Sequence, residues 1–129
     1  MQDNDLLPLA RSLAQSKGWD LFTRNLMLAG KSLQPLSEEM RNEKNAVEGC
    51  ESPVWLCIET EAGVLYAYSP SKIIRGVLAV LLEKANELTP VQRVVFDFDT
   101  YLRQCQLTRY LSQSRGNGIK SVIDRLKVL

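Results

Sequence analysis

The chain has 129 residues, with 16 basic and 15 acidic side chains and a formal net charge of +1. This length fits one domain, so we expect a single domain over residues 1–129. The near-balance of charge gives no support for an extended nucleic-acid footprint. The most hydrophobic stretch, residues 73–82, is about half the length needed to cross a bilayer, and the chain start lacks the basic region of a secretory signal. We therefore expect a cytoplasmic protein that binds neither nucleic acid nor membrane.

The amino-terminal part of the chain favours helices followed by a loop. Residues 6–15 are expected to form a short helix, and apolar side chains recur at helical spacing from Trp19 to Ala29. Gly30 is expected to follow the end of that second helix, because glycine is common just beyond a helix C-terminus. Residues 34–44 carry five charges and little periodicity, which favours a loop.

Three short strands are predicted in the middle of the chain. They cover residues 46–48, 53–59 and 64–68, and residues 61–63 have the composition of a hairpin turn. The apolar run 54–58 is typical of a strand that is covered on both faces. Helices are therefore expected to pack against the sheet.

The clearest helical pattern begins after Ser71 and predicts a central buried helix. Its apolar side chains recur on one helical face, at Ile74, Val77, Leu78 and Leu81. Gly76 lowers helix stability in this pattern, which suggests that another backbone approaches closely there.

Shorter helices are predicted towards the carboxyl end. Thr89 and Pro90 have the pattern of an N-cap and the first helical residue, and residues 98–105 are expected to form another helix. The apolar stripe over residues 119–126 predicts the last helix, with residues 114–118 as the turn that leads into it. The predicted class is α+β: a small antiparallel sheet of about three strands packed against several helices, with helices at both termini.

Cys50 is the strongest candidate for chemistry. Gly49 can bend the chain sharply, and Pro53 restricts Ser52 to an extended conformation, so we expect the thiol on a stiff polar loop. The acidic residues on either side would raise the pKa of this thiol by like-charge repulsion. Arg115 is the candidate cation that would offset this effect.

The other cysteines and the lack of histidine limit the possible reactions. Cys57 and Cys105 lie in apolar segments, and we expect them to be buried structural thiols. The chain contains no histidine, which excludes a Cys–His dyad. The cysteines form no Cys-x-x-Cys redox motif, and their spacing matches no zinc motif. We therefore expect no metal site.

Residues 49–55, with the sequence Gly-Cys-Glu-Ser-Pro-Val-Trp, resemble the signature of the SufE family of small sulfur-acceptor proteins. Further segments resemble other motifs of that family, in its order and close to its spacing. They are Trp19 with residues 28–36, the approach to the cysteine at residues 45–50, the central helix at residues 73–80, and residues 107–118.

The resemblance implies a fold similar to that of iron–sulfur scaffold proteins and a role in sulfur transfer for iron–sulfur cluster assembly. The partner would be a cysteine desulfurase that holds pyridoxal phosphate, so this chain would need no cofactor. Cys50 would accept persulfide sulfur from it, and Gly49, Ser52, Trp55 and Arg115 would support the cysteine or bind the partner. The chain would be a sulfur carrier that stimulates the desulfurase and passes the sulfur on, rather than a stand-alone enzyme.

Two other functions stay open at this point. The chain could regulate a desulfurase by docking alone, with Cys50 incidental to the effect. A thiol redox sensor or peroxidase has only the exposed cysteine in its favour. The family also often carries acidic residues around a serine before the central helix. Here residues 68–71 have none, so we expect partner affinity or orientation to differ.

A persulfide would need shelter from a reducing cytosol. We expect Trp55 and the central-helix residues Val77 and Leu78 to supply apolar surface near the base of the loop. Gly49 would absorb the backbone change if the loop swings outward when the desulfurase docks.

Overall fold

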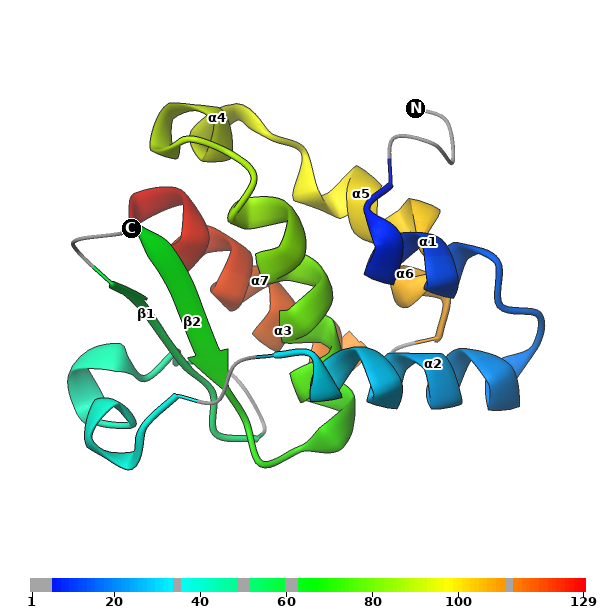
Figure 1. Ribbon diagram of the computed structural model, residues 1–129, viewed down its shortest axis with the longest axis horizontal. Helices are drawn as coiled ribbons and strands as arrows, with labels where there is room; N and C mark the ends of the chain where they lie inside the picture. The colour runs from blue at the N-terminus through cyan, green and yellow to red at the C-terminus, as the bar shows by residue number, and fades with distance from the viewer. Residues whose placement is uncertain (1–5, 34–35, 49–51, 60–62, 111–112) are drawn as a thin grey trace.

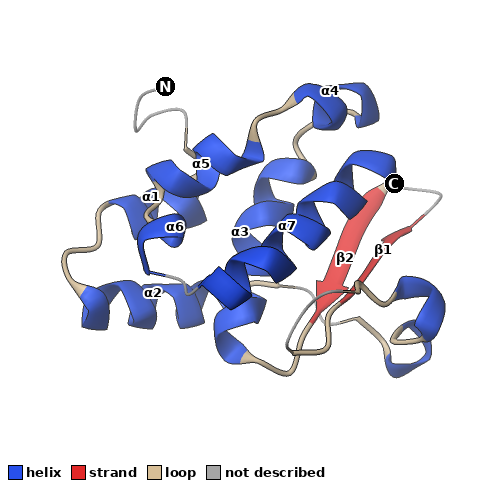
Figure 2. Ribbon diagram, turned by 180° about the vertical axis from the view of Figure 1, so that it is seen from behind, coloured by secondary structure: helices blue, strands red, loops and turns tan. Residues whose placement is uncertain are grey.

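Helices make up most of the chain in the computed structural model, which describes residues 6–33, 36–48, 52–59, 63–110 and 113–129 (Figure 1). The α-helices of these described residues are α1 (Pro8–Ala14), α2 (Trp19–Lys31), α3 (Lys72–Ala85), α4 (Pro90–Val95), α5 (Phe98–Gln104), α6 (Leu107–Tyr110) and α7 (Gln113–Val128). Figure 2 shows the two strands at one side of the molecule, with α1, α5 and α6 at the other and α3 and α7 between.

Helices α2 and α3 touch through two glycines. A Cβ atom added to Gly76 would overlap the carbonyl oxygen of Leu26 and lie 2.8 Å from the Leu26 Cγ atom. A Cβ atom added to Gly30 would lie 3.1 Å from the backbone nitrogen of Gly76. The close approach predicted at Gly76 is confirmed. The prediction that α2 ends before Gly30 is wrong, because this glycine lies inside α2 and gives room for the backbone of α3.

Helix α3 is the central buried helix that the apolar pattern predicts. The Ser71 side chain caps its N-terminus by accepting a hydrogen bond from the Ile74 N–H at 3.3 Å. Every residue from 76 to 82 is buried, and the surrounding core includes Phe22 of α2 and Tyr101 of α5.

The sheet contains two described antiparallel strands, β1 (Trp55–Glu59) and β2 (Val64–Tyr68). Trp55 pairs with Tyr68 at one end, and Glu59 pairs with Val64 at the other. Among the described residues, the third predicted strand is reduced to one antiparallel bridge between Ala46 and Trp55. Strand β2 contacts α3, so the predicted α+β class, with a small antiparallel sheet against helices, is confirmed.

Local hydrogen bonds shape the start of α4 and the segment between α2 and β1. Thr89 caps α4 and Pro90 lies in its first turn, as predicted. The structure adds a reciprocal bond from the Thr89 backbone N–H to the Gln92 side chain, which completes a capping box. Residues 34–44 are not simply loop as predicted: the described part holds the 3₁₀ helix η2 (Glu38–Met40), and the 3₁₀ helix η3 (Glu43–Asn45) begins there.

The turn predicted at residues 114–118 is wrong, because α7 already begins at Gln113. The sequence predicted a turn there because glycine lowers helix stability by about 1 kcal/mol relative to alanine. Gly118 is nevertheless buried at the side of the apolar stripe that starts with Ile119. Tertiary packing therefore outweighs the local preference of glycine.

Candidate functional site

The predicted cysteine loop is closed at its base by a backbone hydrogen bond. The Val47 N–H donates to the Val54 carbonyl oxygen over 2.8 Å, next to the bridge between Ala46 and Trp55. Both valines are buried, so the two ends of the loop are anchored in the protein interior. Cys50 and its two neighbours lie between these ends, outside the described residues.

The described residues on either side of the tip have polar surroundings. Glu48 and Pro53 are exposed, and Ser52 is half-buried. These positions agree with the polar loop expected from the sequence. Trp55, the next predicted site residue, is half-buried at the start of β1.

Arg125 of α7 holds the segment that leads into this loop. Its Nη1 atom donates to the Ala46 carbonyl oxygen at 3.1 Å, and its Nη2 atom donates to the Lys44 carbonyl oxygen at 2.7 Å. A guanidinium presents its N–H donors in a rigid planar fork, which suits two carbonyls of one backbone segment. The role of Arg125 leaves no local pattern in the sequence, because the contact joins residues 79 positions apart.

Asn45 fixes the same segment from the inside. Its side chain is buried, and its Nδ2 atom donates to the Met40 carbonyl oxygen at 2.7 Å. Its backbone N–H donates to Oδ1 of Asn42 at 3.2 Å. Asn45 is the first residue of the motif at residues 45–50 noted in the sequence, and the bond from its Nδ2 atom explains why a side-chain amide is useful there.

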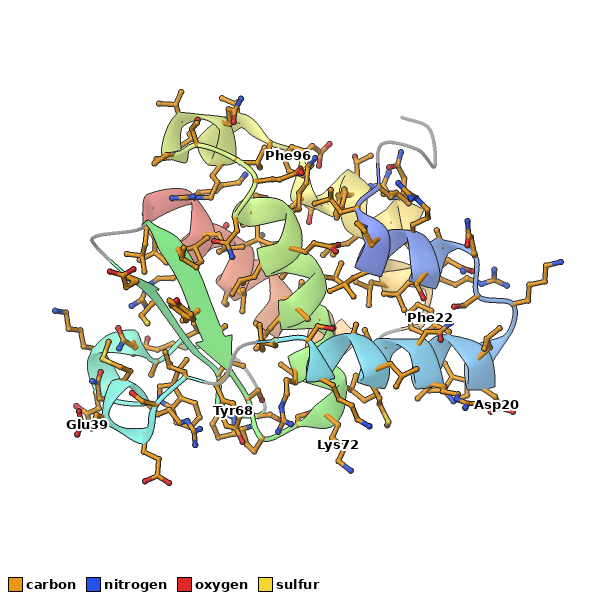
Figure 3. All side chains as sticks on the ribbon, in the orientation of Figure 1. Asp20, Phe22, Glu39, Tyr68, Lys72 and Phe96 are labelled. Atoms are coloured by element: carbon orange, nitrogen blue, oxygen red, sulfur yellow. The ribbon has the colours of Figure 1, made fainter. Side chains whose placement is uncertain are left out.

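Tyr68 lies at one end of the sheet (Figure 3), where it pairs with Trp55 and contacts two arginines. The Tyr68 and Trp55 rings are stacked, with 6.4 Å between their centroids. The Cζ atom of Arg41 lies 3.8 Å from the Tyr68 ring centroid, and that of Arg75 lies 5.0 Å away. A cation near an aromatic face is favourable by about 0.5–1 kcal/mol at exposed sites. The base of the loop therefore adjoins a cationic, aromatic corner.

Ser69 joins this corner to α3. The Arg75 Nε atom donates to the Ser69 carbonyl oxygen at 3.0 Å, and the fully buried Ser69 hydroxyl accepts from the Ser71 N–H at 3.3 Å. The sequence showed that residues 68–71 lack acidic side chains. It gave no sign that Arg41 and Arg75 converge on Tyr68, because that depends on how three segments meet.

The SufE family model, described as an Fe-S metabolism associated domain, matches residues 8–129. The chain belongs to the SufE family. The match includes the base of the loop, the Tyr68 corner and Arg125, so all three lie within the SufE domain. It confirms the predicted family and associates the chain with iron–sulfur metabolism.

The two described cysteines of this SufE domain are buried, as predicted. Burial raises the pKa of the Cys57 thiol above its usual value and raises the pKa of Cys105 to about 12. The Cys105 Sγ atom also donates to the Leu102 carbonyl oxygen at 3.4 Å. Because the thiolate is the reactive form, both thiols are poor nucleophiles near neutral pH.

The other predicted site residues lie in different surroundings. Val77 and Leu78, which were expected to cover the loop, are each 1% exposed in the central core, and Trp55 keeps a partly exposed ring at the base of the loop. The backbone of Arg115 belongs to α7, and its side chain lies outside the described part. The proposed contact between Arg115 and Cys50 therefore stays a prediction.

The described residues show neither a metal-binding cluster nor a membrane-spanning helix. No group of three or more histidine, cysteine, aspartate or glutamate side chains gathers there in a way that could hold a metal ion. Within the same residues, no helix is both long and apolar enough to span a membrane.

Proposed function

We propose that this SufE-family protein accepts persulfide sulfur on Cys50 from a cysteine desulfurase and passes it on for iron–sulfur cluster assembly. The family match over residues 8–129 carries the proposal, because it associates the chain with iron–sulfur metabolism. The anchored base at Val47 and Val54 supports it, since a loop with fixed ends can present a thiol at a reproducible place. The desulfurase would supply the pyridoxal phosphate.

The transfer needs one accessible thiolate and no general base. The Cys50 thiolate attacks the outer sulfur of the desulfurase persulfide, a new S–S bond forms, and the old S–S bond breaks. The desulfurase cysteine leaves as a thiolate, so no external oxidant or reductant takes part. Arg41 and Arg75 add positive charge at the Tyr68 corner beside the base of the loop, and a cation close to the Cys50 thiol would favour its thiolate form.

The other predicted site residues have supporting roles in this proposal. Gly49 gives the loop the freedom to move Cys50 between a sheltered and a presented position. Ser52 and Trp55 form the side of the loop that meets β1, where the partly exposed indole supplies apolar cover. Arg115 would add a further cation for the thiolate or for the partner.

The direct test is incubation of the protein with a purified cysteine desulfurase and cysteine, followed by intact-mass measurement. Transfer of one sulfur adds about 32 Da, and a reductant removes it because it breaks the S–S bond. A Cys50→Ser variant should gain no mass, while Cys57→Ser, the matched control, should gain it normally. Faster desulfurase turnover without any mass gain on the wild-type chain would instead identify a docking regulator.

A further inference from the structure

A groove along α2 exposes three large apolar side chains. Trp19, Met27 and Leu28 are 51%, 38% and 50% exposed, and all three line a groove of about 520 Å³ that we call the α2 groove. The groove also reaches the first turns of α3. Large apolar side chains gathered on a surface, with polar residues around them, are typical of an interaction site.

The polar lining of the α2 groove is mostly cationic. Arg24, Lys31, Lys72 and Arg75 line it, against one carboxylate, Asp20. Asp20 and Lys72 extend from α2 and α3 on the same edge of the molecule, the lower one in Figure 3. The whole chain has a net charge of only +1, so this lining is locally rich in positive charge.

Among the described residues, no acidic side chain forms an ion pair with the α2 cations Arg24 and Lys31. In the part of the chain that the structure describes, the ion pair with an N–O distance within 4 Å joins Lys84 and Glu87. Neither residue lines the groove. Arg24 and Lys31 are both exposed. An apolar surface with an unpaired cationic rim is complementary to an acidic surface that carries apolar side chains.

The α2 groove is continuous with the corner beside the cysteine loop. Arg75 lines the groove, and its Nη2 atom also approaches the Tyr68 hydroxyl at 3.4 Å. Tyr68 pairs with Trp55, the first residue of β1 after the loop. A protein that delivers sulfur to this loop would therefore meet the α2 groove along the same side of the molecule.

We propose that the α2 groove binds an acidic segment of the cysteine desulfurase, which places apolar side chains against Trp19 and Leu28. The proposal rests on the proposed function and adds a second contact, separate from the loop. The apolar side chains would determine how long the complex lasts, and the cations would mainly determine how fast it forms.

Charge reversal tests the cationic rim. The variant Arg24→Glu/Lys31→Glu should raise the Kd for a purified cysteine desulfurase about tenfold at low ionic strength, mainly through a slower association rate. The difference should shrink at about 1 M salt, where the Debye length falls to roughly 3 Å. The matched control, Arg103→Glu/Lys120→Glu, makes the same charge change at exposed positions on α5 and α7. If both variants weaken binding equally, net charge explains the effect and the groove proposal is overturned.

Truncation tests the apolar floor. Trp19→Ala should speed dissociation of the complex with little change in association rate, because its contact forms after the encounter. Val91→Ala is the matched control, since Val91 is 77% exposed on α4, away from the groove. Unchanged dissociation of the Trp19→Ala variant would overturn the proposal, provided that circular dichroism shows it folded.

Sulfur loading separates this proposal from the proposed function. At saturating desulfurase, the Arg24→Glu/Lys31→Glu variant should load Cys50 to the wild-type extent. Normal loading with an unchanged Kd would refute the groove and leave sulfur acceptance intact. Failure of the wild-type chain to gain sulfur would refute sulfur acceptance, while the same Kd measurements would still decide whether the groove binds the desulfurase.

Discussion

Arg125 and Ala46 join the last helix to the base of the cysteine loop, with 3.1 Å between the Nη1 atom and the carbonyl oxygen. The second donor of the same guanidinium reaches Lys44. Ala46 is also bridged to Trp55, so one side chain of α7 restrains the backbone that enters the loop and, through the bridge, the strand that leaves it. This contact makes α7 part of the machinery that positions the loop.

The first prediction concerns Arg125. Arg125→Ala removes both hydrogen bonds and should lower the free energy of unfolding by about 1 kcal/mol, because the contact is partly solvated. Backbone amides at residues 44–47 should exchange hydrogen faster, and sulfur transfer to Cys50 should slow several-fold. Lys120→Ala, at an exposed position of α7, is the control. Unchanged exchange and unchanged transfer in Arg125→Ala would show that the contact does not position the loop.

The second prediction concerns the helix crossing. Gly76→Ala should lower the free energy of unfolding by about 3 kcal/mol, because the new methyl group meets the backbone and side chain of Leu26. Gly30→Ala should change it by less than about 1 kcal/mol, since the gain in helix propensity offsets a milder contact. Urea unfolding of the two variants measures both values. Equally small losses in the free energy of unfolding for both variants would mean that α2 can shift to accept either methyl group.

The third prediction concerns alkaline pH. An unfolded Cys105 thiol would lose its proton near the model-compound value of 9.0, whereas burial keeps the folded thiol protonated until about pH 12. Between these values the folded state binds more protons, so this contribution to stability is complete below about pH 9 and falls as pH rises. The limiting slope is about 1.4 kcal/mol per pH unit.

Cys105→Ala should remove this part of the pH dependence. Denaturant unfolding at several pH values between 8 and 11 should show a shallower decline for the variant, whatever constant offset the lost side chain adds. Tyr101, whose pKa burial raises to about 12, should keep some decline in the variant. Parallel curves for the two proteins would contradict the assignment of the slope to Cys105.

The fourth prediction concerns Arg115. If its cation supports the Cys50 thiolate, Arg115→Ala should raise the pKa of Cys50, measured by alkylation rate against pH. Weaker desulfurase binding with an unchanged pKa would instead place Arg115 in the docking surface. Normal alkylation and normal transfer kinetics would leave Arg115 with no role beyond α7.

The sequence predicted those parts of the fold that depend on neighbouring residues. The Thr89 cap and the buried face of α3 are local patterns, and both are present in the structure. Gly30 was misread because its local meaning, a helix end, differs from its tertiary one, a contact with Gly76. The turn predicted at residues 114–118 was wrong for a related reason, since Gly118 is buried within α7.

The candidate site was predictable only in part. The composition of the loop around Cys50 identified the thiol worth testing. Arg41, Arg75 and Arg125 act through contacts between distant segments, which periodicity and spacing do not encode.

Peptide mapping of the transferred sulfur tests the central claim most directly. A chain carrying Cys57→Ala and Cys105→Ala keeps Cys50 as its only thiol, because the sequence has three cysteines. After incubation with a cysteine desulfurase and cysteine, our account predicts a gain of about 32 Da, removable by reductant, on the peptide that contains Cys50. A wild-type chain that carries the persulfide on Cys57 or Cys105, with none on Cys50, would contradict it.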